Sequence, residues 1–526
     1  MEQTKLNVLI PNEEDKKGKT TREKVKNTYT EELFLGICAP IGSMKDNVIS
    51  SITKILKETY NYEIQILKLT DYIEKYKTQE YAQRAGKTEA YSKLVYKIDE
   101  GNAIRSKYNN KSVLVELAIK DIHNARISQT KTLEAIPKPE EYKSRRICFI
   151  FNSIKNIEEL LLLRQIYTDN FYQFSIFSPQ DERETNLREK DLSPSEIKNI
   201  VETDDYDNIS YGQNVRGTFT EGDFFLRVSN ENLDKLDDKI KRYLNLIFES
   251  SIVTPTADEI AMYAAKSAAG NSACLSRQVG AAITTKKGNL ISTGWNDVPK
   301  FGGNLYTEGD MSDSRCITTG LCSNDAQKDI LVESIVETLK SDIELSTIFN
   351  DEKGFVDLKK INLFTSKLRF SKIKDLIEFS RSVHAEMHAI ITGSQLSGSK
   401  MVNGKLFCTT YPCHNCAKHI IAAGIKEVYY IEPYIKSLCL TLHNDAITED
   451  ENSKDKVRIL IFDGVAPRKY LNFFTNFTER KDKSGRMIKK NFKTITPKVS
   501  KSLQALPTLE AQAIHSLEQC GLLKID

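Results

Sequence analysis

Two short segments of the chain carry residues whose types and spacing suit catalysis at a metal ion. His384 and Glu386 stand two positions apart, and Pro412 precedes Cys413 and Cys416 in a C-x-x-C spacing. One neutral imidazole and two thiolates fill three corners of a zinc tetrahedron and leave the fourth for water, whereas a structural site closes all four. Glu386 cannot easily ligate the same ion, but its carboxylate can reach the water. The pattern predicts a catalytic Zn²⁺ site.

The H-x-E and P-C-x-x-C segments together resemble the signature of zinc-dependent nucleobase deaminases. A structural zinc knuckle or a redox pair also uses C-x-x-C, but neither explains a Glu two residues after the His. A zincin is excluded, because it needs the Glu directly after the first His. The resemblance implies that Glu386 takes a proton from the water that attacks C4 of cytosine, and returns it as ammonia leaves.

The surrounding residues predict the elements that hold these side chains. Residues 383–391 contain no Gly or Pro and predict a helix, and the apolar run 405–410 predicts a buried strand. A second helix is expected over 413–423, where a glycine ends it, followed by a strand around 428–431. The partial positive charge at a helix start favours thiolate over thiol, which strengthens metal binding by Cys413.

Upstream of the zinc motif, residues 276–283 and 289–296 predict a β-hairpin that ends in a polar loop. Its V-G-A and G-W-N segments, with the zinc motif, are similar to those of the deoxycytidylate deaminases. The resemblance implies that Asn296 binds the sugar or base and that Arg277 lies near the sugar-phosphate end. His388 stands where that family usually has Asn, and we expect it in the pocket wall or in packing.

The connection between this hairpin and the first zinc ligand is unusually long and contains Cys316 and Cys322. Two thiols without an obvious third ligand are more often ordinary cysteines than a second metal site. After the zinc helices, Lys436, Arg468 and Lys469 are candidates for binding the phosphates of a substrate. A solvated surface charge explains each of these three residues equally well.

The N-terminal half contains a strand, a glycine loop and a helix in succession. Residues 33–38 predict a buried strand and 47–58 a helix, and backbone amides at such a helix start can cradle phosphate. The transferring lysine is missing, because the expected G-K-[ST] reads Gly42-Ser43-Met44, which makes kinase chemistry doubtful. The predicted nucleotide-binding, P-loop-like residues are Gly36, Ala39, Pro40, Ile41, Gly42 and Ser43.

The predicted fold class is α/β in both halves. Strands at 147–151 and 171–177, on either side of a helix at 156–167, predict a mostly parallel sheet in a P-loop kinase-like domain. The resemblance implies a cytidine-deaminase-like three-layer α/β/α domain in the C-terminal half. The expected organisation is a polar tail at 1–30, a regulatory nucleotide-kinase-like domain at 31–250, a zinc-dependent deaminase domain at 251–475 and a C-terminal extension at 476–526.

The pairing of the two halves resembles the bacterial anti-phage dCTP deaminases, from about Glu31 to about Arg480. The resemblance implies deamination of dCTP, or of dCMP, to deoxyuridine nucleotides, which depletes the dCTP pool and starves phage DNA synthesis. It also implies a homo-oligomer and a regulatory nucleotide, such as dTTP, dCTP or another NTP, at the N-terminal domain. An inhibitory RNA or protein is a further partner to consider.

The composition of the chain bears on the class of substrate and on the cellular location that we expect. The 75 basic and 72 acidic residues nearly balance, which argues against a polynucleotide deaminase and favours a small substrate. A pterin- or riboflavin-pathway deaminase shares the motif but does not explain the N-terminal half, and a housekeeping dCMP deaminase with a nucleotide-sensing domain remains open. Ten cysteines, two of them needed as thiolates, and the lack of a membrane-spanning apolar run lead us to expect a cytoplasmic protein.

Overall fold

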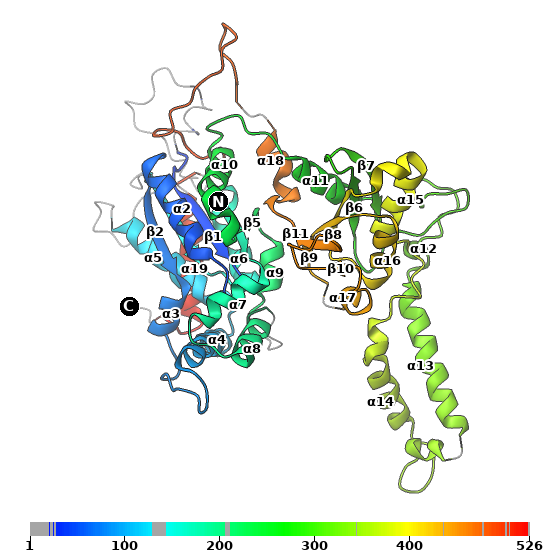
Figure 1. The fold of residues 1–526 in the computed structure, drawn as a ribbon. Helices are drawn as coiled ribbons and strands as arrows, with labels where there is room; N and C mark the ends of the chain where they lie inside the picture. Colours follow the sequence, from blue (N-terminus) through cyan, green and yellow to red (C-terminus); the bar gives the residue numbers. More distant parts are fainter. Residues whose placement is uncertain are drawn as a thin grey trace, which may run out of the picture. The chain divides into compact units, whose positions relative to one another are not determined.

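The computed structural model describes residues 20, 25, 28–128, 144–205, 211–342, 344–434, 436–475, 478–499, 502, 503 and 505–523. The chain divides into two compact units (Figure 1). Unit 1 comprises Met1–Thr254 and Leu471–Asp526, and unit 2 comprises Pro255–Tyr470. Most of the expected polar tail lies outside the described residues, and the segment after 476 belongs to unit 1.

Unit 1 is built on a parallel sheet. Its strands are β1 (Leu33–Cys38), β2 (Glu63–Lys68), β3 (Ile147–Asn152), β4 (Phe171–Phe177) and β5 (Phe224–Arg227). They lie in the order β2-β3-β1-β4-β5, and each neighbouring pair runs parallel, so the prediction of a mostly parallel sheet is confirmed. Every residue of the central strand β1 is buried, as expected of an apolar strand inside a parallel sheet.

The helices of unit 1 are α2 (Lys45–Glu58), α3 (Leu69–Lys75), α4 (Glu89–Lys107), α5 (Val113–Ile127), α6 (Ile157–Tyr167), α7 (Gln180–Arg188), α8 (Pro194–Asp205), α9 (Val215–Thr220), α10 (Leu236–Phe248) and α19 (Leu506–Gln519). Helix α2 begins two residues earlier than the sequence predicts, at Lys45, which brings this lysine into the first turn. Helix α6 begins at a capping box, in which Asn156 and Glu159 satisfy the free backbone N–H groups of the first turn.

The late helix α19 packs on α5 and completes the core of unit 1. Leu506 and Leu517 are fully buried in the same hydrophobic cluster as the residues of α5. Beside them, the buried Arg126 of α5 donates to Glu510 of α19 at 2.9 Å and to Glu32 at 2.7 Å. Burial raises the pKa of Glu510, but the charges of Arg126 and His123 outweigh it and hold the pKa below its ordinary value.

Unit 2 contains a mixed sheet. Its strands are β6 (Gly280–Thr284), β7 (Leu290–Trp295), β8 (Lys405–Thr410), β9 (Glu427–Glu432), β10 (Ile447–Thr448) and β11 (Val457–Ile461). The short strand β12 (Gly464–Val465) follows in the chain and is not part of this sheet. The order is β7-β6-β8-β9-β11-β10. The β6–β7 pair is antiparallel, which confirms the predicted hairpin, and β8 through β10 pair in parallel.

The helices of unit 2 are α11 (Ala257–Ala269), α12 (Cys316–Thr319), α13 (Ser323–Ser341), α14 (Leu358–Arg369), α15 (Ala385–Ser397), α16 (His414–Ala422) and α17 (Cys439–Leu442). Helix α18 (Tyr470–Phe474) begins at the last residue of unit 2, and its other residues belong to unit 1. Helix α15 packs on β7, and α11 packs on β6. Within the described ranges, no helix combines the length and the apolar character needed to cross a bilayer.

The long connection between the β6–β7 hairpin and α15 forms a helical hairpin of its own. Helices α13 and α14 lie side by side and extend away from the sheet of unit 2 (Figure 1). Val332 and Val336 of α13 are nearly fully buried, and the ring of Phe349 packs edge-on against Phe364 of α14 at 5.4 Å. The chain returns to the sheet through the segment that leads into His384.

Candidate active site

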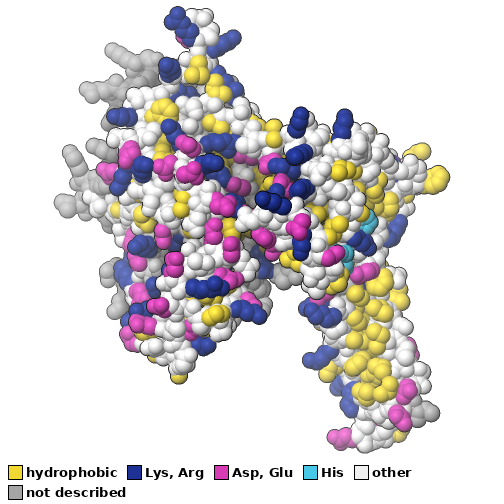
Figure 2. All heavy atoms as spheres, in the orientation of Figure 1, with side chains coloured by type: hydrophobic (Ala, Val, Ile, Leu, Met, Phe, Trp, Pro, Cys, Tyr) yellow, Lys and Arg dark blue, Asp and Glu magenta, His cyan; other side chains and the backbone are white. Residues whose placement is uncertain are grey.

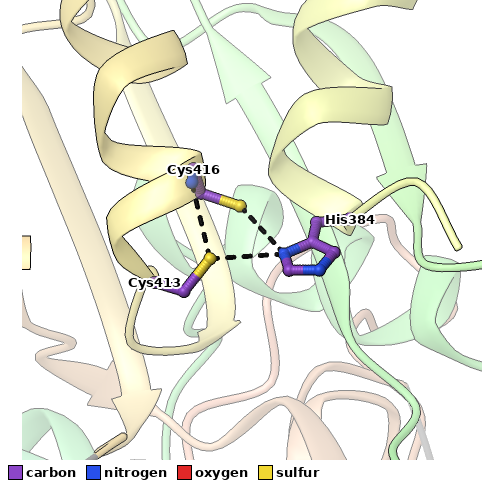
Figure 3. A group of neighbouring side chains, drawn as sticks. All are labelled: His384, Cys413 and Cys416. Carbon is purple, nitrogen blue, oxygen red and sulfur yellow. Dashed lines mark hydrogen bonds between the residues drawn. The ribbon is translucent and has the colours of Figure 1, made fainter. Parts of the chain in front are cut away.

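The starts of two helices bring the predicted metal ligands together. His384 is the N-cap residue of α15, and Cys413 is the N-cap residue of α16, with Cys416 in the first turn. His384 Nδ1 lies 3.3 Å from Cys413 Sγ and 3.3 Å from Cys416 Sγ (Figure 3). The Cys416 N–H points at Cys413 Sγ from 3.4 Å, so the helix start itself orients this sulfur.

These three residues fit a zinc ion. Their ligand atoms all lie within 4.8 Å of one another. A tetrahedral zinc ion with Zn–S bonds of about 2.3 Å and Zn–N bonds of about 2.0 Å separates its ligand atoms by roughly 3.5–3.8 Å. The observed distances of 3.3 Å are close to that value, and the donor set is one nitrogen and two sulfurs. Three protein ligands leave one tetrahedral position open, as in catalytic rather than structural zinc sites.

The electrostatics of the centre favour a thiolate at Cys413. Hydrogen bonding from Cys416 and from His384 lowers the pKa of Cys413 to about 4. Burial raises the pKa of Cys416 well above its ordinary value. A coordinating metal ion deprotonates a thiol directly. A bound zinc ion would therefore hold Cys416 as a thiolate in spite of its raised pKa.

Glu386 lies in the first turn of α15, two residues after the histidine ligand, and is 4% exposed. Burial and the charge of Cys413 raise the pKa of its carboxyl group. A raised pKa brings a carboxyl group nearer to neutral pH, where it both accepts and donates protons efficiently. The structure therefore places a proton-transfer group at the same helix start as the metal ligands.

Two of the metal ligands, His384 and Cys413, open with Glu386 into one cavity of about 360 Å³. This volume is in the range of sites that hold small molecules. Asn296 and Arg277, predicted from the β6–β7 hairpin, line the same cavity. The cavity is also lined by Thr410 at the end of β8, by Tyr411 directly after it, and by Tyr434 in the loop after β9.

Asn296 holds the backbone of the segment that carries Arg277. Its Oδ1 accepts from the Val279 N–H at 2.7 Å, and its Nδ2 donates to the Arg277 carbonyl at 2.9 Å. Asn296 is 8% exposed, whereas the Arg277 side chain is exposed and lies over the Tyr434 ring at 5.9 Å. Asn296 thus fixes the backbone of this wall, and Arg277 stands at its exposed side.

The long insertion supplies a wall of the cavity that sequence reasoning missed. Ser323, Asn324 and Lys328 at the base of α13 line it, as does the segment Lys374–Ile377 after α14. Lys328 is 5% exposed and donates to the Lys374 carbonyl at 3.0 Å. The predicted phosphate candidate Lys436 also lines the cavity, and its Nζ lies 2.7 Å from Asp375 Oδ1. In the sequence, the unusual length of the insertion was the one sign of this wall, because the insertion carries no recognisable motif.

His388 lies one turn further along α15 and lines a different cavity, together with Trp295, Asn304 and other residues. Its Nδ1 accepts from the Trp295 N–H at 3.2 Å, so its Nε2–H donates to Asn304 Oδ1 at 3.0 Å. Burial lowers its pKa, which favours the neutral ring. His388 therefore lines a cavity other than the one into which His384 and Glu386 open.

Cys316 and Cys322 both line the zinc cavity. Cys316 Sγ lies 3.9 Å from Ser323 Oγ, and Cys322 Sγ lies 3.8 Å from Ser276 Oγ. In the described part of the chain, the ligand atoms close enough to share a metal belong to His384, Cys413 and Cys416. The two cysteines therefore contribute to the cavity wall without forming a second metal group there.

The glycine loop of unit 1 lies between β1 and α2, as predicted. Gly42 has a positive φ of 84°, and a Cβ there would lie 2.6 Å from the Arg183 carbonyl oxygen. Gly36 instead lies inside β1, where a Cβ would meet Ile154 and Phe171 at 2.6 Å. Gly36 therefore serves packing within the core, whereas Gly42 serves the turn of the loop.

A carboxylate from elsewhere in unit 1 is bound to this loop. Asp204 of α8 accepts from the Ile41 N–H at 2.7 Å and from Lys155 Nζ at 2.7 Å. Lys155 follows β3 and also donates to the Ala39 carbonyl at 2.9 Å. Lys45 Nζ donates to Asn152 Oδ1 at 3.0 Å and to Ser153. Lys155 and one backbone amide thus bind this carboxylate, whereas Lys45 binds the neighbouring Asn152 and Ser153.

Comparisons with known proteins agree with the geometry of unit 2. Residues 255–432 match the family model described as cytidine and deoxycytidylate deaminase zinc-binding region. The chain is 47% identical over 55 residues to ComE operon protein 2 of Bacillus subtilis (strain 168), which covers 10% of this chain and 29% of that protein. It is 29% identical over 166 residues to the deoxycytidylate deaminase of Enterobacteria phage T2, covering 32% of this chain and 74% of that protein.

Among solved structures, the apo form of dCMP deaminase from the cyanophage S-TIM5 aligns with 40% of this chain and 100% of its own, at 18% identity and a TM-score of 0.21. The family model and the three clustered ligand atoms identify the cofactor as Zn²⁺, which confirms the prediction. Unit 2 therefore contains a deoxycytidylate deaminase-like zinc-binding domain.

Proposed function

We propose that the chain catalyses the hydrolytic deamination of deoxycytidine nucleotides, with dCTP as the main substrate and dCMP as a second one. The products are the deoxyuridine nucleotide and ammonia. The observation that carries the proposal is a buried Glu386 at the same helix start as His384, opening into a cavity with Cys413. The match of residues 255–432 to a deaminase zinc-binding region supports the same chemistry.

Each residue of the site has a part in this chemistry. The zinc ion, when bound, supplies the Lewis acidity that activates water at neutral pH. Glu386 accepts the proton of the attacking water and delivers it to the cytosine ring nitrogen. The water oxygen adds to C4, and Glu386 then takes the remaining proton of the new C4 hydroxyl group and gives it to the exocyclic nitrogen. The bond from C4 to that nitrogen breaks as the C4 carbonyl forms, and the amine departs as ammonia. The raised pKa of Glu386 suits a group that must both accept and donate.

The charge of the cavity favours a nucleotide over a free nucleoside. Arg277, Lys328, Lys374 and Lys436 all line it, against the two acidic lining residues Asp375, which pairs with Lys436, and Glu386. A triphosphate carries more negative charge than a monophosphate, and several cations in one cavity favour the more highly charged ligand. We therefore place dCTP ahead of dCMP.

Ammonia release tests the proposed reaction. The zinc-loaded full-length chain would be given dCTP, dCMP, deoxycytidine or a cytosine-containing single-stranded DNA at equal concentrations. Release from dCTP and dCMP, with the higher kcat/KM for dCTP, supports the proposal. Release from the single strand alone would instead indicate a polynucleotide deaminase. A kcat/KM that favours dCMP would indicate a housekeeping dCMP deaminase.

We propose that the cellular role is depletion of the dCTP pool in defence against phage. The resemblance to paired P-loop-like and deaminase halves supports this role, together with the parallel sheet and glycine loop of unit 1. Nucleotide pools measured in infected cells would test it. Cells that express the native chain should lose dCTP and gain dUTP or dUMP, and cells that express Glu386→Gln should not.

A regulatory nucleotide at the loop of unit 1 is a second part of the proposal. The loop amide of Ile41 already binds a carboxylate, and Lys155 and Lys45 flank it, so the site has the chemistry to hold a phosphate group. Lys155 supplies a cation that the sequence pattern lacked. In this arrangement, Asp204 and an incoming phosphate compete for the same donors, and the nucleotide must displace Asp204 to bind.

Isothermal titration of the full-length chain with dTTP, dCTP and ATP tests this part. To keep the active site from contributing, the titration would use Glu386→Gln and include excess deoxycytidine 5′-monophosphate. We expect Asp204→Asn to tighten nucleotide binding about tenfold or more, because it removes the competing charge. Lys155→Met should abolish that binding, and no binding to any of the three proteins at millimolar nucleotide would remove the idea.

A further inference from the structure

The insertion between β7 and α15 places a buried lysine in the wall of the zinc cavity. Lys328 lies in the second turn of α13, lines the cavity and is 5% exposed. Its Nζ donates to the Lys374 carbonyl at 3.0 Å, which is its one hydrogen bond within the described part of the chain. An ammonium group carries three donors, so two of them remain for a group in the cavity.

The carboxylate that pairs with Lys328 is shared with a second cation. Asp325 Oδ1 lies 3.6 Å from Lys328 Nζ but 3.0 Å from Arg369 Nη2 of α14, and the Asp325 side chain is 51% exposed. A buried ammonium group costs free energy unless an anion compensates its charge. Asp325 compensates Lys328 only in part, because Arg369 binds it more closely. Lys328 therefore has the capacity to bind an anion in the cavity.

Two more lysines line the same cavity beside Lys328. Lys374 is exposed, and Lys436 Nζ lies 2.7 Å from Asp375 Oδ1. The hydrogen bond from Lys436 and the charge of Lys374 hold the pKa of the Asp375 carboxyl group below its ordinary value, although burial opposes them. Figure 2 shows basic side chains along one edge of the helical hairpin, up to the end that joins the rest of unit 2. Three lysines thus share this wall with one carboxylate.

The start of α13 adds to the positive potential of the wall. Ser323 and Asn324 of its first turn line the cavity. The N-cap residue Cys322 makes no side-chain hydrogen bond to the helix, so N–H groups of the first turn are available to an anion. The partial charge at a helix start is positive, like the charge of Lys328. The buried lysine and the helix start therefore favour the same kind of ligand.

The proposed reaction determines which part of a nucleotide reaches this wall. Attack at C4 requires the base to lie beside Glu386 and the metal ligands. In a deoxycytidine nucleotide the 5′-phosphates stand at the opposite end of the molecule from C4, with the sugar between them. The nucleotides dCMP and dCTP share the base, the sugar and the first phosphate. A preference for dCTP therefore needs donors that contact the second and third phosphates.

We propose that Lys328, together with Lys374 and Lys436, binds the β- and γ-phosphates of dCTP, so that the insertion sets the preference for a triphosphate. The assignment to dCTP rests on the proposed deaminase function, whereas a polyphosphate site at these lysines does not. Lys328 contacts the phosphates and not the reacting atoms, so its role is in specificity. Its burial holds the side chain in place before the ligand arrives, which reduces the entropy lost on binding.

Steady-state kinetics test the inference with the zinc-loaded full-length chain. Ammonia release would give kcat/KM for dCTP and for dCMP. Lys328→Met should lower the ratio of the dCTP value to the dCMP value about 10- to 100-fold, the effect of losing a hydrogen bond to a charged group. Lys340→Met is the matched control on the same helix and should keep the native ratio, because Lys340 pairs with Glu337 and is 38% exposed.

Lys374→Ala covers the case in which Lys328→Met does not fold, which zinc content and circular dichroism would report. Lys374 is exposed, and alanine keeps the backbone carbonyl that binds Lys328. This variant should lower the same ratio. A folded Lys328→Met with the native ratio would overturn the inference. If Lys328→Met is unfolded, a native ratio in Lys374→Ala would overturn it.

Calorimetric titration with inorganic tripolyphosphate separates the phosphate site from the reaction. The full-length chain would carry Lys155→Met, so that the loop of unit 1 does not contribute, and zinc content after the titration would check that the metal stays bound. We expect tripolyphosphate to bind, and adding Lys328→Met to weaken the binding about tenfold or more. Binding that Lys328→Met leaves unchanged would overturn the inference. Binding through Lys328 without ammonia release from any deoxycytidine nucleotide would instead remove the proposed function.

Discussion

Gly294 of β7 lies against the backbone of Ala389 in α15, with no room for a side chain between them. A Cβ on Gly294 would lie 2.4 Å from the Ala389 nitrogen and 2.4 Å from the Ala385 carbonyl oxygen. Helix α15 carries His384 at its start and Glu386 in its first turn. The strand therefore sets the depth at which the metal ligand and the proton carrier lie in unit 2.

Gly294→Ala is expected to lower the free energy of unfolding of unit 2 by about 1–3 kcal/mol, the usual cost of overpacking a tight contact. Because α15 must move, zinc affinity should fall as well. Urea denaturation and a zinc titration would measure both effects. Gly398→Ala is the control, since a Cβ at Gly398 meets no atom within 4 Å. Equal stability of the two variants would show that a methyl group at position 294 can be accommodated against α15.

Glu386→Gln should retain zinc and lose activity. Glutamine preserves the shape of the side chain but cannot carry the proton, and such proton transfer contributes about 10²–10⁴-fold to a rate. The measurements are kcat from ammonia release and zinc content per chain. Glu308→Gln is the control, because the Glu308 side chain is fully exposed. Near-normal turnover by Glu386→Gln would mean that another group moves the proton.

Cys416→Ala should lose most of the bound zinc. The remaining His384 and Cys413 provide two of the three protein ligands, and the geometry of a tetrahedral site no longer closes around the ion. Metal analysis after dialysis, with the melting temperature of the protein, would measure the loss. The control is Cys520→Ala. Cys520 is the C-cap residue of α19 in unit 1, so this variant should keep the native zinc content. Zinc retained by Cys416→Ala would require a ligand other than these three.

The contribution of Lys45 to the stability of unit 1 is expected to change with pH in the alkaline range. Burial and the charge of Lys155 lower the pKa of Lys45 to about 8, compared with its ordinary value of 10.5. Between these two values the unfolded chain binds more protons than the folded chain, so the free energy of unfolding contributed by Lys45 rises with pH there. Below pH 8 the buried charge opposes folding.

The matching measurement is urea denaturation at several pH values from 7 to 10. Lys45→Met should be more stable than the native chain at pH 7, and the difference should shrink as pH approaches 10. Lys54→Met is the control, because the Lys54 side chain is 57% exposed and pairs with Asp237 on the surface. A pH dependence shared by all three proteins would assign the effect to other groups.

Arg126→Met should destabilise unit 1 by about 3–5 kcal/mol, because it removes the buried cation that binds both Glu32 and Glu510 and leaves them only Arg145 and His123. Thermal or urea denaturation would show the loss, and protease susceptibility of α19 should rise with it. A triple variant with Glu32→Gln and Glu510→Gln removes the unpaired charges and should recover part of the stability. No recovery would point to lost packing of Arg126 instead.

The sequence predicted local features of the fold well where a short segment determines them. The strand expected at 405–410 matches β8 residue for residue, and both helix starts that hold zinc ligands lie within two residues of the prediction. Helix periodicity and caps are local signals, so they can be read from one segment. The same holds for the β6–β7 hairpin.

Contacts between distant segments were not predictable in the same way. Asp204 binds the Ile41 N–H across 163 positions of the chain, and no pattern near either residue indicates it. Lys328 reaches the zinc cavity only because the insertion folds back on it. His388 occupies a separate cavity because the next helical turn of α15 faces β7 rather than the ligands. Such pairings follow from packing, which a single sequence does not display.

The return of α19 to unit 1 affects the order of events on the ribosome. The chain of β1 to β5 emerges first, but the helix that completes its core, with Glu510, is made only after all of Pro255–Tyr470. Until then Arg126 lacks one carboxylate partner, and the side of α5 that packs against α19 faces solvent. The zinc domain can thus fold and take up its metal while the first domain still awaits its last helix.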